Sequence, residues 1–261
     1  MKKVTKEKTE KSSIHEFDFN LICEYFSSIK QQGPGSKETT LKALSFIKGL
    51  NKKSKIADLG CGTGSPTMII AKNTQANIVG LDIFPGFINI FNKNFNKIKN
   101  RVKGIVGSMD KLPFKQEEFD VIWSEGSIYN IGFERGLNEW KKFIKKGGYV
   151  AVSEASWFTN TRPEEINNFW NKAYPEIDTI SNKVRQIENA GYVPVATFIL
   201  PEDCWIENFY KPQAVAQKEF LKKYKGNVTV ERLISNQRLE AELYKKYKQY
   251  YGYVFYIAKK I

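Results

Sequence analysis

From residue 55 onward, the chain alternates short apolar runs with amphipathic stretches. This alternation is typical of βα units that build a mostly parallel sheet, because each strand is buried and each connecting helix is half-buried. The apolar runs predict seven strands, at residues 55–59, 77–82, 101–108, 119–126, 147–157, 192–200 and 251–260. We therefore expect an α/β fold with a seven-stranded sheet, flanked by helices, whose last strand runs antiparallel.

Two regions fall outside this alternation. Residues 14–50 predict an N-terminal flap of two helices, with Ser36 capping the second. Residues 202–250 form an insertion between the last two strands and are rich in large aromatic side chains. Two interpretations of the insertion stand open: a lid over an apolar or planar ligand, or ordinary packing of amphipathic helices.

The domain organisation follows from these assignments. Residues 14–261 are expected to form a single Rossmann-like domain that includes both additions. Residues 1–13 carry five lysines and are expected to be a flexible basic tail.

A glycine-rich loop follows the first strand and opens a helix, with Ser65 as the expected cap and Pro66 as the first helical residue. The dinucleotide fingerprint GxGxxG fails here, because its third glycine position falls on Ser65. The loop instead has an acidic residue followed by three alternating glycines: Asp58, Gly60, Gly62 and Gly64. A carboxylate suits a ligand with a positively charged amino-acid tail and is a poor neighbour for a pyrophosphate. The pattern therefore favours S-adenosylmethionine, which has an ammonium, a sulfonium and no phosphate.

The next two strands also end in acidic residues. Asp82 follows Gly60 by 22 positions (82 − 60), where a carboxylate accepts hydrogen bonds from ribose hydroxyls. After the third strand, Met109 is placed to pack on an adenine ring and Asp110 to accept from its exocyclic amine. Each residue alone is typical of a turn or a helix cap. Together these residues favour one cofactor site, because they occur in order at the ends of three successive strands.

These segments resemble the successive motifs of class I methyltransferases of the ubiquinone/menaquinone-biosynthesis type. The motifs are IADLGCGTG (56–64), VGLDIFPGFI (79–88) and GSMDKLPFKQEEFDVIWSEGSIYNI (107–131). Almost the whole chain is also similar to a small group of bacterial proteins described only as methyltransferases of that type. That longer similarity includes FDFN (17–20), QGPGS (32–36), VSEASWF (152–158) and YYGYVFYI (250–257).

The motifs and the resemblance together predict the cofactor-binding residues. The cofactor is expected to be S-adenosyl-L-methionine and its product S-adenosyl-L-homocysteine. The contacts expected on the sheet side are Asp58, Gly60, Cys61, Gly62, Gly64, Asp82, Ile83, Ser108, Met109, Asp110 and Glu125. The resemblance further implies that Tyr25, Gln32 and Gly33 form a flap over the cofactor.

The methyl acceptor should lie over the carboxyl ends of the strands, where a Rossmann-like sheet binds ligands. Transfer from a sulfonium is an in-line displacement, so the protein mainly aligns the acceptor and excludes water. Glu125 is a candidate cofactor ligand, general base, holder of a cationic substrate, or helix cap. Tyr129 and Asn130 are candidates to orient the acceptor, with Tyr129 also a candidate catalytic residue.

Two further candidates have competing interpretations. Trp157, near Glu154 at the end of the fifth strand, suits an aromatic or cationic acceptor, or is a core or lid residue. His15 is the only histidine; it is either solvated or catalytic.

The composition limits which partners and which cellular location we expect. The formal net charge of +13 comes from lysines spread along the chain, which favours a solvated basic surface over a nucleic-acid stripe. No apolar run is long enough for a membrane span. The three cysteines are far apart, so we expect no metal site and no disulfide framework, and a cytoplasmic location.

A small-molecule methyltransferase is the leading hypothesis, acting as a monomer or homodimer. An RNA methyltransferase, a protein methyltransferase and a non-catalytic cofactor-binding protein stay open. The Asp/Asn-Pro-Pro-aromatic loop of base-amine methylation is replaced by Ser124-Glu125-Gly126-Ser127. No cysteine follows a proline, as cytosine-C5 chemistry would need.

Overall fold

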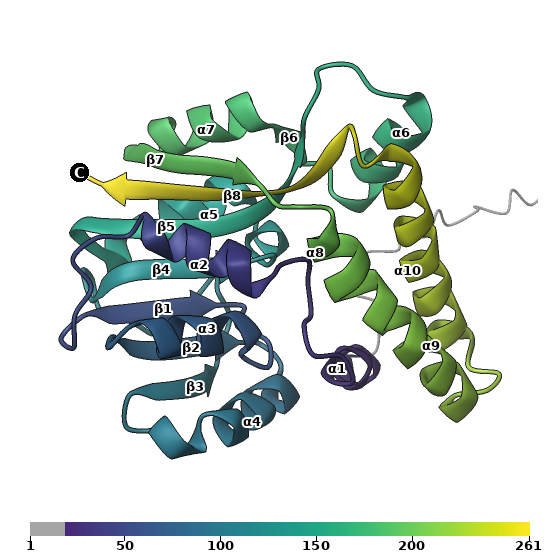
Figure 1. Ribbon diagram of the computed structural model, residues 1–261, viewed down its shortest axis with the longest axis horizontal. Helices are drawn as coiled ribbons and strands as arrows, with labels where there is room; N and C mark the ends of the chain where they lie inside the picture. Colours follow the sequence, from purple (N-terminus) through teal and green to yellow (C-terminus); the bar gives the residue numbers. More distant parts are fainter. Residues whose placement is uncertain (1–18) are drawn as a thin grey trace, which may run out of the picture.

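The computed structural model describes residues 19–261, and its centre is one mixed sheet (Figure 1). The strands are ordered β3-β2-β1-β4-β5-β8-β7. Their bounds are β1 (Lys55–Leu59), β2 (Asn77–Asp82), β3 (Val102–Val106), β4 (Phe119–Glu125), β5 (Ile144–Trp157), β7 (Tyr192–Ile199) and β8 (Tyr251–Lys260). Strands β1 to β5 pair in parallel, and β8 lies antiparallel between β5 and β7. The predicted seven strands and the antiparallel last strand are confirmed.

The sheet contains one strand that the pattern did not predict. β6 (Asp178–Thr179) adds two residues in parallel to the end of β5. Two residues are too short to produce a recognisable hydrophobic period. β5 also begins at Ile144, three residues before the expected start at 147.

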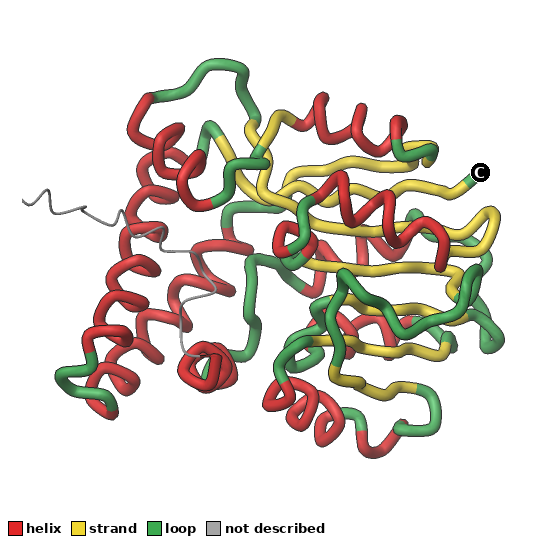
Figure 2. The backbone as a smooth tube through the Cα atoms, turned by 180° about the vertical axis from the view of Figure 1, so that it is seen from behind, coloured by secondary structure: helices red, strands yellow, loops and turns green. Residues whose placement is uncertain are grey.

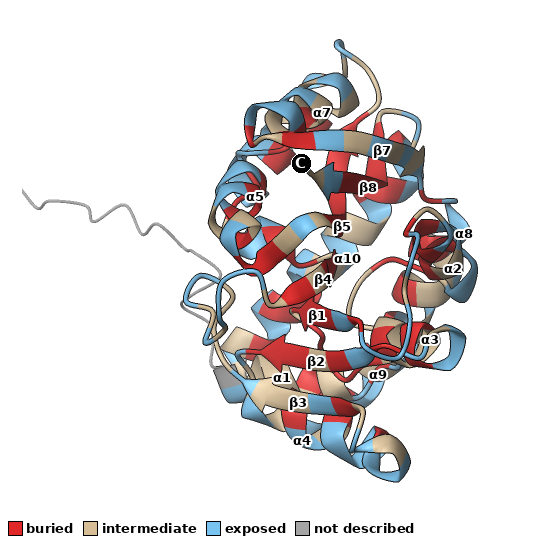
Figure 3. Ribbon diagram, turned by 90° about the vertical axis from the view of Figure 1, so that its left-hand side faces the viewer, coloured by how far each residue is buried: buried red, intermediate tan, exposed pale blue. Residues whose placement is uncertain are grey.

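Helices cover both faces of the sheet, as the end-on view in Figure 3 shows. The core on one face joins helices α2, α3 and α4 to the sheet, and the core on the other face joins α5 and α7. Their bounds are α2 (Lys37–Ser45), α3 (Ser65–Asn73), α4 (Pro85–Asn94), α5 (Phe133–Trp140) and α7 (Ile180–Asn189). Short 3-10 turns complete the connections: η2 (Asn96–Ile98), η3 (Ile128–Asn130) and η4 (Lys141–Phe143).

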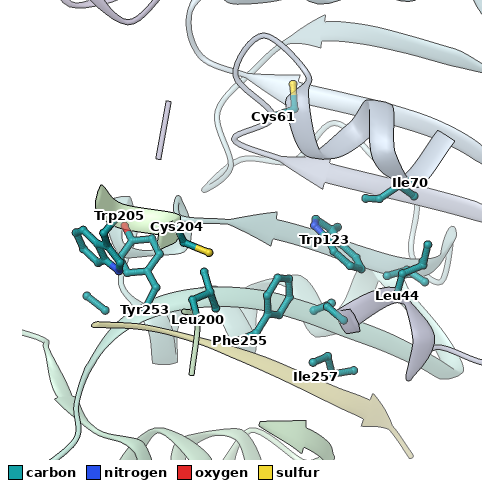
Figure 4. Close-up of a cluster of buried hydrophobic side chains, with 14 of the residues drawn as sticks. Leu44, Cys61, Ile70, Trp123, Leu200, Cys204, Trp205, Tyr253, Phe255 and Ile257 are labelled. Atoms are coloured by element: carbon teal, nitrogen blue, oxygen red, sulfur yellow. The ribbon is translucent and has the colours of Figure 1, made fainter. Parts of the chain in front are cut away.

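Strand burial explains the sequence patterns. β8 lies between two strands and is buried over its first eight residues, so it reads as a continuous apolar run. β7 is at the sheet edge and alternates buried with more exposed positions. Figure 4 shows Trp123, Phe255 and Ile257 in the core next to the sheet, with Trp205 and Tyr253 at one end of the same cluster.

The insertion is helical and lies beyond the carboxyl ends of the parallel strands (Figures 1 and 2). It consists of α8 (Asp203–Trp205), the π-helical turn η5 (Ile206–Tyr210), α9 (Lys211–Lys223) and α10 (Val228–Tyr247). We call these four elements the lid helices. The N-terminal helix α1 (Phe19–Ser27) packs against them through a small apolar core, and α6 (Glu164–Ala173) follows β5.

The two predicted helix caps have different outcomes. Ser36 caps α2, where it accepts from Thr39 N in a capping box, as expected. The prediction for Ser65 is wrong by one position: Gly64 occupies the cap with φ 93°, and Ser65 is the first helical residue. A left-handed glycine replaces the side-chain cap here, because the loop must turn sharply to leave β1.

The sheet order places a topological switch point beside β1. The chain moves from β1 to β2 and β3 on one side, and then to β4 and β5 on the other. The loops after β1 and β4 therefore diverge and leave a crevice at the carboxyl edge, which is where such sheets bind ligands.

Candidate active site

The glycine-rich loop at 60–64 is hydrogen-bonded entirely within the chain. Its five backbone N–H groups donate to Leu81 O (twice), Asp82 Oδ2, Gln32 Oε1 and Cys61 O. A phosphate cradle needs free N–H groups that point at the ligand. This loop has none to offer, so its geometry disfavours a pyrophosphate and suits a ligand that lacks phosphate.

Gly60 is required by close packing. It has φ 70°, and a Cβ at this position would lie 2.5 Å from the Cβ of Ser127 and 3.0 Å from the terminal methyl of Met109. Ser127 cannot withdraw easily, because its hydroxyl donates to Leu59 O at 2.8 Å. The glycine thus lets the loops after β1, β3 and β4 meet at one point.

Asp58 ties the first strand to the following helix. Its side chain is 2% exposed and accepts a short hydrogen bond from the Thr67 hydroxyl on α3. Burial raises the pKa of Asp58 to about 7, with a further contribution from the neighbouring Asp82. The carboxyl group acts on the ligand site through its charge and through the position of α3.

Asp82 lies at the end of β2 and holds the glycine loop. Its Oδ2 accepts from Gly62 N at 2.9 Å, and its Oδ1 accepts from Phe84 N at 3.0 Å. Each oxygen retains a second lone pair that a hydroxyl could use. Burial raises the pKa of this carboxyl group too. The adjoining Ile83 is 50% exposed, an apolar side chain open to a ring at this edge.

The loop after β3 is fixed by two hydrogen bonds. The Ser108 hydroxyl donates to Asp110, and the Trp140 ring N–H donates to Met109 O at 2.8 Å. The Met109 side chain lies against Gly60, and Asp110 is exposed. The structure thus brings Met109 beside the glycine loop, whereas Asp110 is exposed and hydrogen-bonded to Ser108.

The N-terminal flap is anchored by Gln32. Its Oε1 accepts from the N–H and hydroxyl of Thr63, and its Nε2 donates to the carbonyl oxygens of Phe26 and Ile29. A Cβ on Gly62 would lie 2.6 Å from that same Oε1. Gln32 therefore couples the position of α1 to the glycine loop, with Gly33 following it in the chain.

Tyr25, the third predicted flap residue, is 0% exposed. Its ring packs on Phe26 and Phe220, and its hydroxyl donates to Gln213 Oε1 at 2.9 Å. In this conformation Tyr25 contacts the lid helices rather than the glycine loop. It joins α1 to α9, so the flap and the lid form one packed unit.

Glu125 ends β4 between the flap and the sheet. Its Oε1 accepts from the Thr40 hydroxyl and from the Trp123 ring N–H, each at 2.9 Å. Burial raises the pKa of this carboxyl group to about 8, against the lowering effect of both hydrogen bonds. Asp58, Asp82 and Glu125 thus place three carboxyl groups with raised pKa values near the ends of β1, β2 and β4.

The predicted acceptor residues have different surroundings. Tyr129 is 36% exposed and meets Tyr174 edge to face, with ring centroids 5.9 Å apart. Burial raises the pKa of Tyr129 to about 12, so it is a phenol at neutral pH. Asn130 is exposed and donates to Ser127 O.

Trp157 is a core residue in this structure. It is 1% exposed, packs edge to face on Tyr251, and carries the Arg162 guanidinium 4.1 Å above its ring. Because these neighbours cover its ring, Trp157 has no exposed face that could contact an acceptor in this structure. His15 and the predicted tail at 1–13 lie outside the described residues.

The lid helices and β8 add residues to the site that the sequence prediction missed. Glu240 on α10 accepts from the Tyr210 hydroxyl at 3.0 Å. Tyr253 on β8 lies over Gly126, whose Cβ would be 3.0 Å from the tyrosine ring. A signal for Glu240 was present: it shares a helix face with Tyr244 and Tyr247 at i, i+4, i+7 spacing, which puts a carboxyl on an apolar face.

Part of the chain is similar to known methyltransferases. Residues 57–152 match the family model of the methyltransferase domain. The chain is 24% identical over 162 residues to phosphoethanolamine N-methyltransferase 3 of Arabidopsis thaliana, covering 62% of this chain and 33% of that protein. It is 29% identical over 139 residues to sterol 24-C-methyltransferase of Kluyveromyces lactis, covering 52% and 37%. The chain thus spans about a third of the length of these curated relatives.

The fold comparison extends over nearly the whole chain. An S-adenosylmethionine-dependent methyltransferase from Geobacter sulfurreducens, solved with S-adenosyl-L-homocysteine, superimposes with a TM-score of 0.80 at 14% identity. It covers 93% of this chain and 98% of that one. The chain therefore has the Rossmann-like fold of that structure, as predicted, and the match to the methyltransferase domain model covers residues 57–152 of it. Across residues 19–261, no helix has both the length and the apolar character that crossing a bilayer requires.

Proposed function

We propose that the protein binds S-adenosylmethionine at the switch point and transfers its methyl group to a small-molecule acceptor. The observation that carries this proposal is the loop at 60–64, whose N–H groups are all used within the chain, with the buried carboxyl groups of Asp58 and Asp82 beside it and the partly buried Glu125 at the end of the neighbouring strand β4. A cationic ligand without phosphate fits that combination, because it gains from the carboxylates and asks for no N–H donors.

The chain's residues would divide the binding between them. Asp82 would accept from the ribose hydroxyls, while Ile83 and Met109 would enclose the adenine ring. Glu125, with its pKa of about 8, would ionise against the ligand's positive charges. Gln32 would hold the flap closed over the loop.

When bound, S-adenosylmethionine supplies an activated methyl carbon: its bond to sulfur breaks as the bond to the acceptor forms, and the sulfur leaves neutral. The protein's task is to align the acceptor behind that carbon and to exclude water. The lid helices lie beyond the carboxyl ends of the parallel strands (Figure 1). They would align the acceptor and exclude water.

A small acceptor is supported by the relatives, two of which are named for phosphoethanolamine and sterol methylation. The resemblance to methyltransferases of the ubiquinone/menaquinone-biosynthesis type agrees with a small acceptor but does not name one. All three cysteines are free thiols, which fits a reducing cytoplasm as the location of the reaction.

The test is calorimetric titration with S-adenosyl-L-homocysteine, followed by a turnover screen that detects its release from S-adenosylmethionine. The acceptors would include amines, phenols, carboxylic acids, an RNA pool and a protein pool. Binding with turnover on small molecules supports the proposal. Binding with turnover only on RNA or protein overturns the acceptor class, and binding without any turnover favours a non-catalytic protein. Failure to bind overturns the whole proposal.

A further inference from the structure

Glu240 lies in a ring of tyrosines on the lid side of the site. It is only partly buried, and it accepts from Tyr210 on η5. Its charge also acts on Tyr129 of η3 and on Tyr253 of β8, whose pKa values it helps to raise. The rings of Tyr210 and Tyr253 both pack on Trp205, with centroids 5.7 Å and 4.8 Å from it, so Tyr253 belongs to the same aromatic cluster as the hydrogen-bonded pair of Glu240 and Tyr210.

Glu240 has no basic neighbour to neutralise it. None of the ion pairs among residues 19–261 includes Glu240. The factors that change its pKa are burial, which raises it to about 7, and the Tyr210 hydroxyl, which lowers it. A partly buried carboxylate without a counterion is less stable than one in water, so a positively charged partner would stabilise Glu240 in its ionised form.

A second carboxyl group points to the same ligand chemistry. Glu154 on β5 is 1% exposed, and neither of its oxygens has a hydrogen-bond partner of good geometry, although the Tyr174 hydroxyl is near enough to lower its pKa. Like Glu240, it helps to raise the pKa values of Tyr129 and Tyr253. The two tyrosines therefore lie within reach of both carboxyl groups. The buried Lys183 offsets part of the charge of Glu154.

This cluster adjoins the proposed methyl-donor site. The Tyr253 ring covers Gly126, the residue after Glu125, and a Cβ there would be 3.6 Å from the Tyr253 hydroxyl. Ser127, the next residue, touches Gly60 of the glycine loop. A molecule held between Glu240 and Tyr253 would thus lie next to the donor.

We propose that the methyl acceptor is a small primary, secondary or tertiary amine that binds as its ammonium ion to Glu240 among Tyr129, Tyr210 and Tyr253. The bound ammonium loses one proton, to Glu240 or to water, and the freed nitrogen lone pair then forms the bond to the methyl carbon as the carbon–sulfur bond breaks. This inference rests on the proposed function, since it names the substrate class of the same site. The carboxylate supplies the counterion and the tyrosines supply ring faces, which attract cations, together with hydroxyl groups. A neutral acceptor would leave Glu240 uncompensated, and an anionic one would be repelled.

The test is binding of benzylammonium and its neutral isostere, benzyl alcohol, to the full chain saturated with S-adenosyl-L-homocysteine. We expect benzylammonium to bind at least tenfold more tightly. The Glu240→Gln variant should lose that preference and retain its affinity for S-adenosyl-L-homocysteine, which shows that it is folded. Glu242→Gln is the matched control, because Glu242 is exposed on the same helix, and it should retain the preference.

The pH dependence gives a second readout. Benzylammonium affinity should rise about tenfold from pH 6 to pH 8 as Glu240 ionises, and the rise should shrink in Glu240→Gln. Glu154 titrates in the same range, while the facing tyrosines keep their protons because their pKa values are raised. The titratable groups that respond to Glu240 are Tyr129, Tyr210, Tyr251 and Tyr253.

The outcomes separate this inference from the proposed function. Equal binding of the alcohol and the ammonium, or an unchanged preference in Glu240→Gln, overturns the cation site. Turnover confined to neutral or anionic acceptors overturns it too, while methyl transfer itself stands. If S-adenosyl-L-homocysteine does not bind, the proposed function fails first.

Discussion

The two halves of the site are built in opposite ways. On the donor side, the polar groups come from loops that directly follow β1 to β4, and hydrogen bonds within the chain fix most of them. On the lid side, Glu240 and Glu154 come from distant parts of the chain. Glu240 has one hydrogen bond, from Tyr210, and no ion pair among the described residues, and the charge of Glu154 is offset only in part by Lys183. The first half is preorganised, and the second has charge left for a ligand.

The difference corresponds to two tasks. A site for a constant ligand gains from a rigid geometry that is complete before binding, because less entropy is lost when the ligand arrives. A site for a particular acceptor is set by side chains that can vary without disturbing the sheet. The comparison predicts that substitutions on the donor side abolish cofactor binding, whereas those on the lid side change acceptor binding alone.

The largest effect should come from Gly60→Val. The new side chain would overlap Ser127 and Met109 and would require φ 70°, so cofactor affinity should fall more than a thousandfold, below detection in calorimetry. Gly226→Val is the control, since Gly226 has a similar φ of 80° but a Cβ there meets nothing within 4 Å. Circular dichroism should show both variants folded; a folded Gly60→Val that still binds the cofactor would mean that the loop is not the donor site.

Asp82→Ala should have the next largest effect. It removes the proposed ribose acceptors and the hydrogen bonds to Gly62 and Phe84, at a cost of about 2–4 kcal/mol of cofactor binding. Asp120→Asn, whose carboxyl pairs with Lys145 at the opposite end of β4, should leave affinity unchanged. Calorimetry that finds equal losses in the two variants would remove Asp82 from the cofactor site.

The contrast between the donor side and the lid side also explains which residues the sequence could predict. The motifs of the donor side are local: a strand, a turn and an acidic residue at its end fix Asp58, Gly60 and Asp82 in one place, since parallel strands end at one edge. The bounds of β1, β2 and β8 matched the prediction, because a buried strand between turn residues has a clear pattern.

The lid side depends on tertiary packing, which the sequence does not encode locally. Which face of α10 points at the sheet is decided by its contacts with other elements, so Glu240 could be placed on an apolar face but not beside Tyr253. Trp157 depends on tertiary packing in the same way. Its place near a strand end left two interpretations open, an acceptor contact or a core or lid residue, and the cover that β6, Arg162 and Tyr251 give it favours the second.

The lid carboxyl group should also affect stability. With a pKa raised from 4.5 to about 7, Glu240 binds more protons folded than unfolded, so its contribution makes the protein less stable as pH rises from about 5 to 8. Glu240→Gln should therefore be about 2–3 kcal/mol more stable than the wild type at pH 8 and nearly equal at pH 5. Urea unfolding without ligand measures this. A gain of equal size at both pH values would show a packing effect instead, and Glu242→Gln should show no pH-dependent change.

The smallest effect, and the sharpest comparison, should come from Glu125→Gln. The amide keeps an oxygen for Thr40 and Trp123 but loses the charge, so S-adenosylmethionine affinity at pH 8 should fall about tenfold. Benzylammonium affinity should stay within about twofold, the reverse of the pattern expected for Glu240→Gln. Titrating both variants with both ligands completes the comparison. If Glu125→Gln instead weakens the binding of benzylammonium and leaves cofactor binding unchanged, Glu125 belongs to the acceptor half of the site. The end of β4 is then part of the acceptor half rather than the donor half.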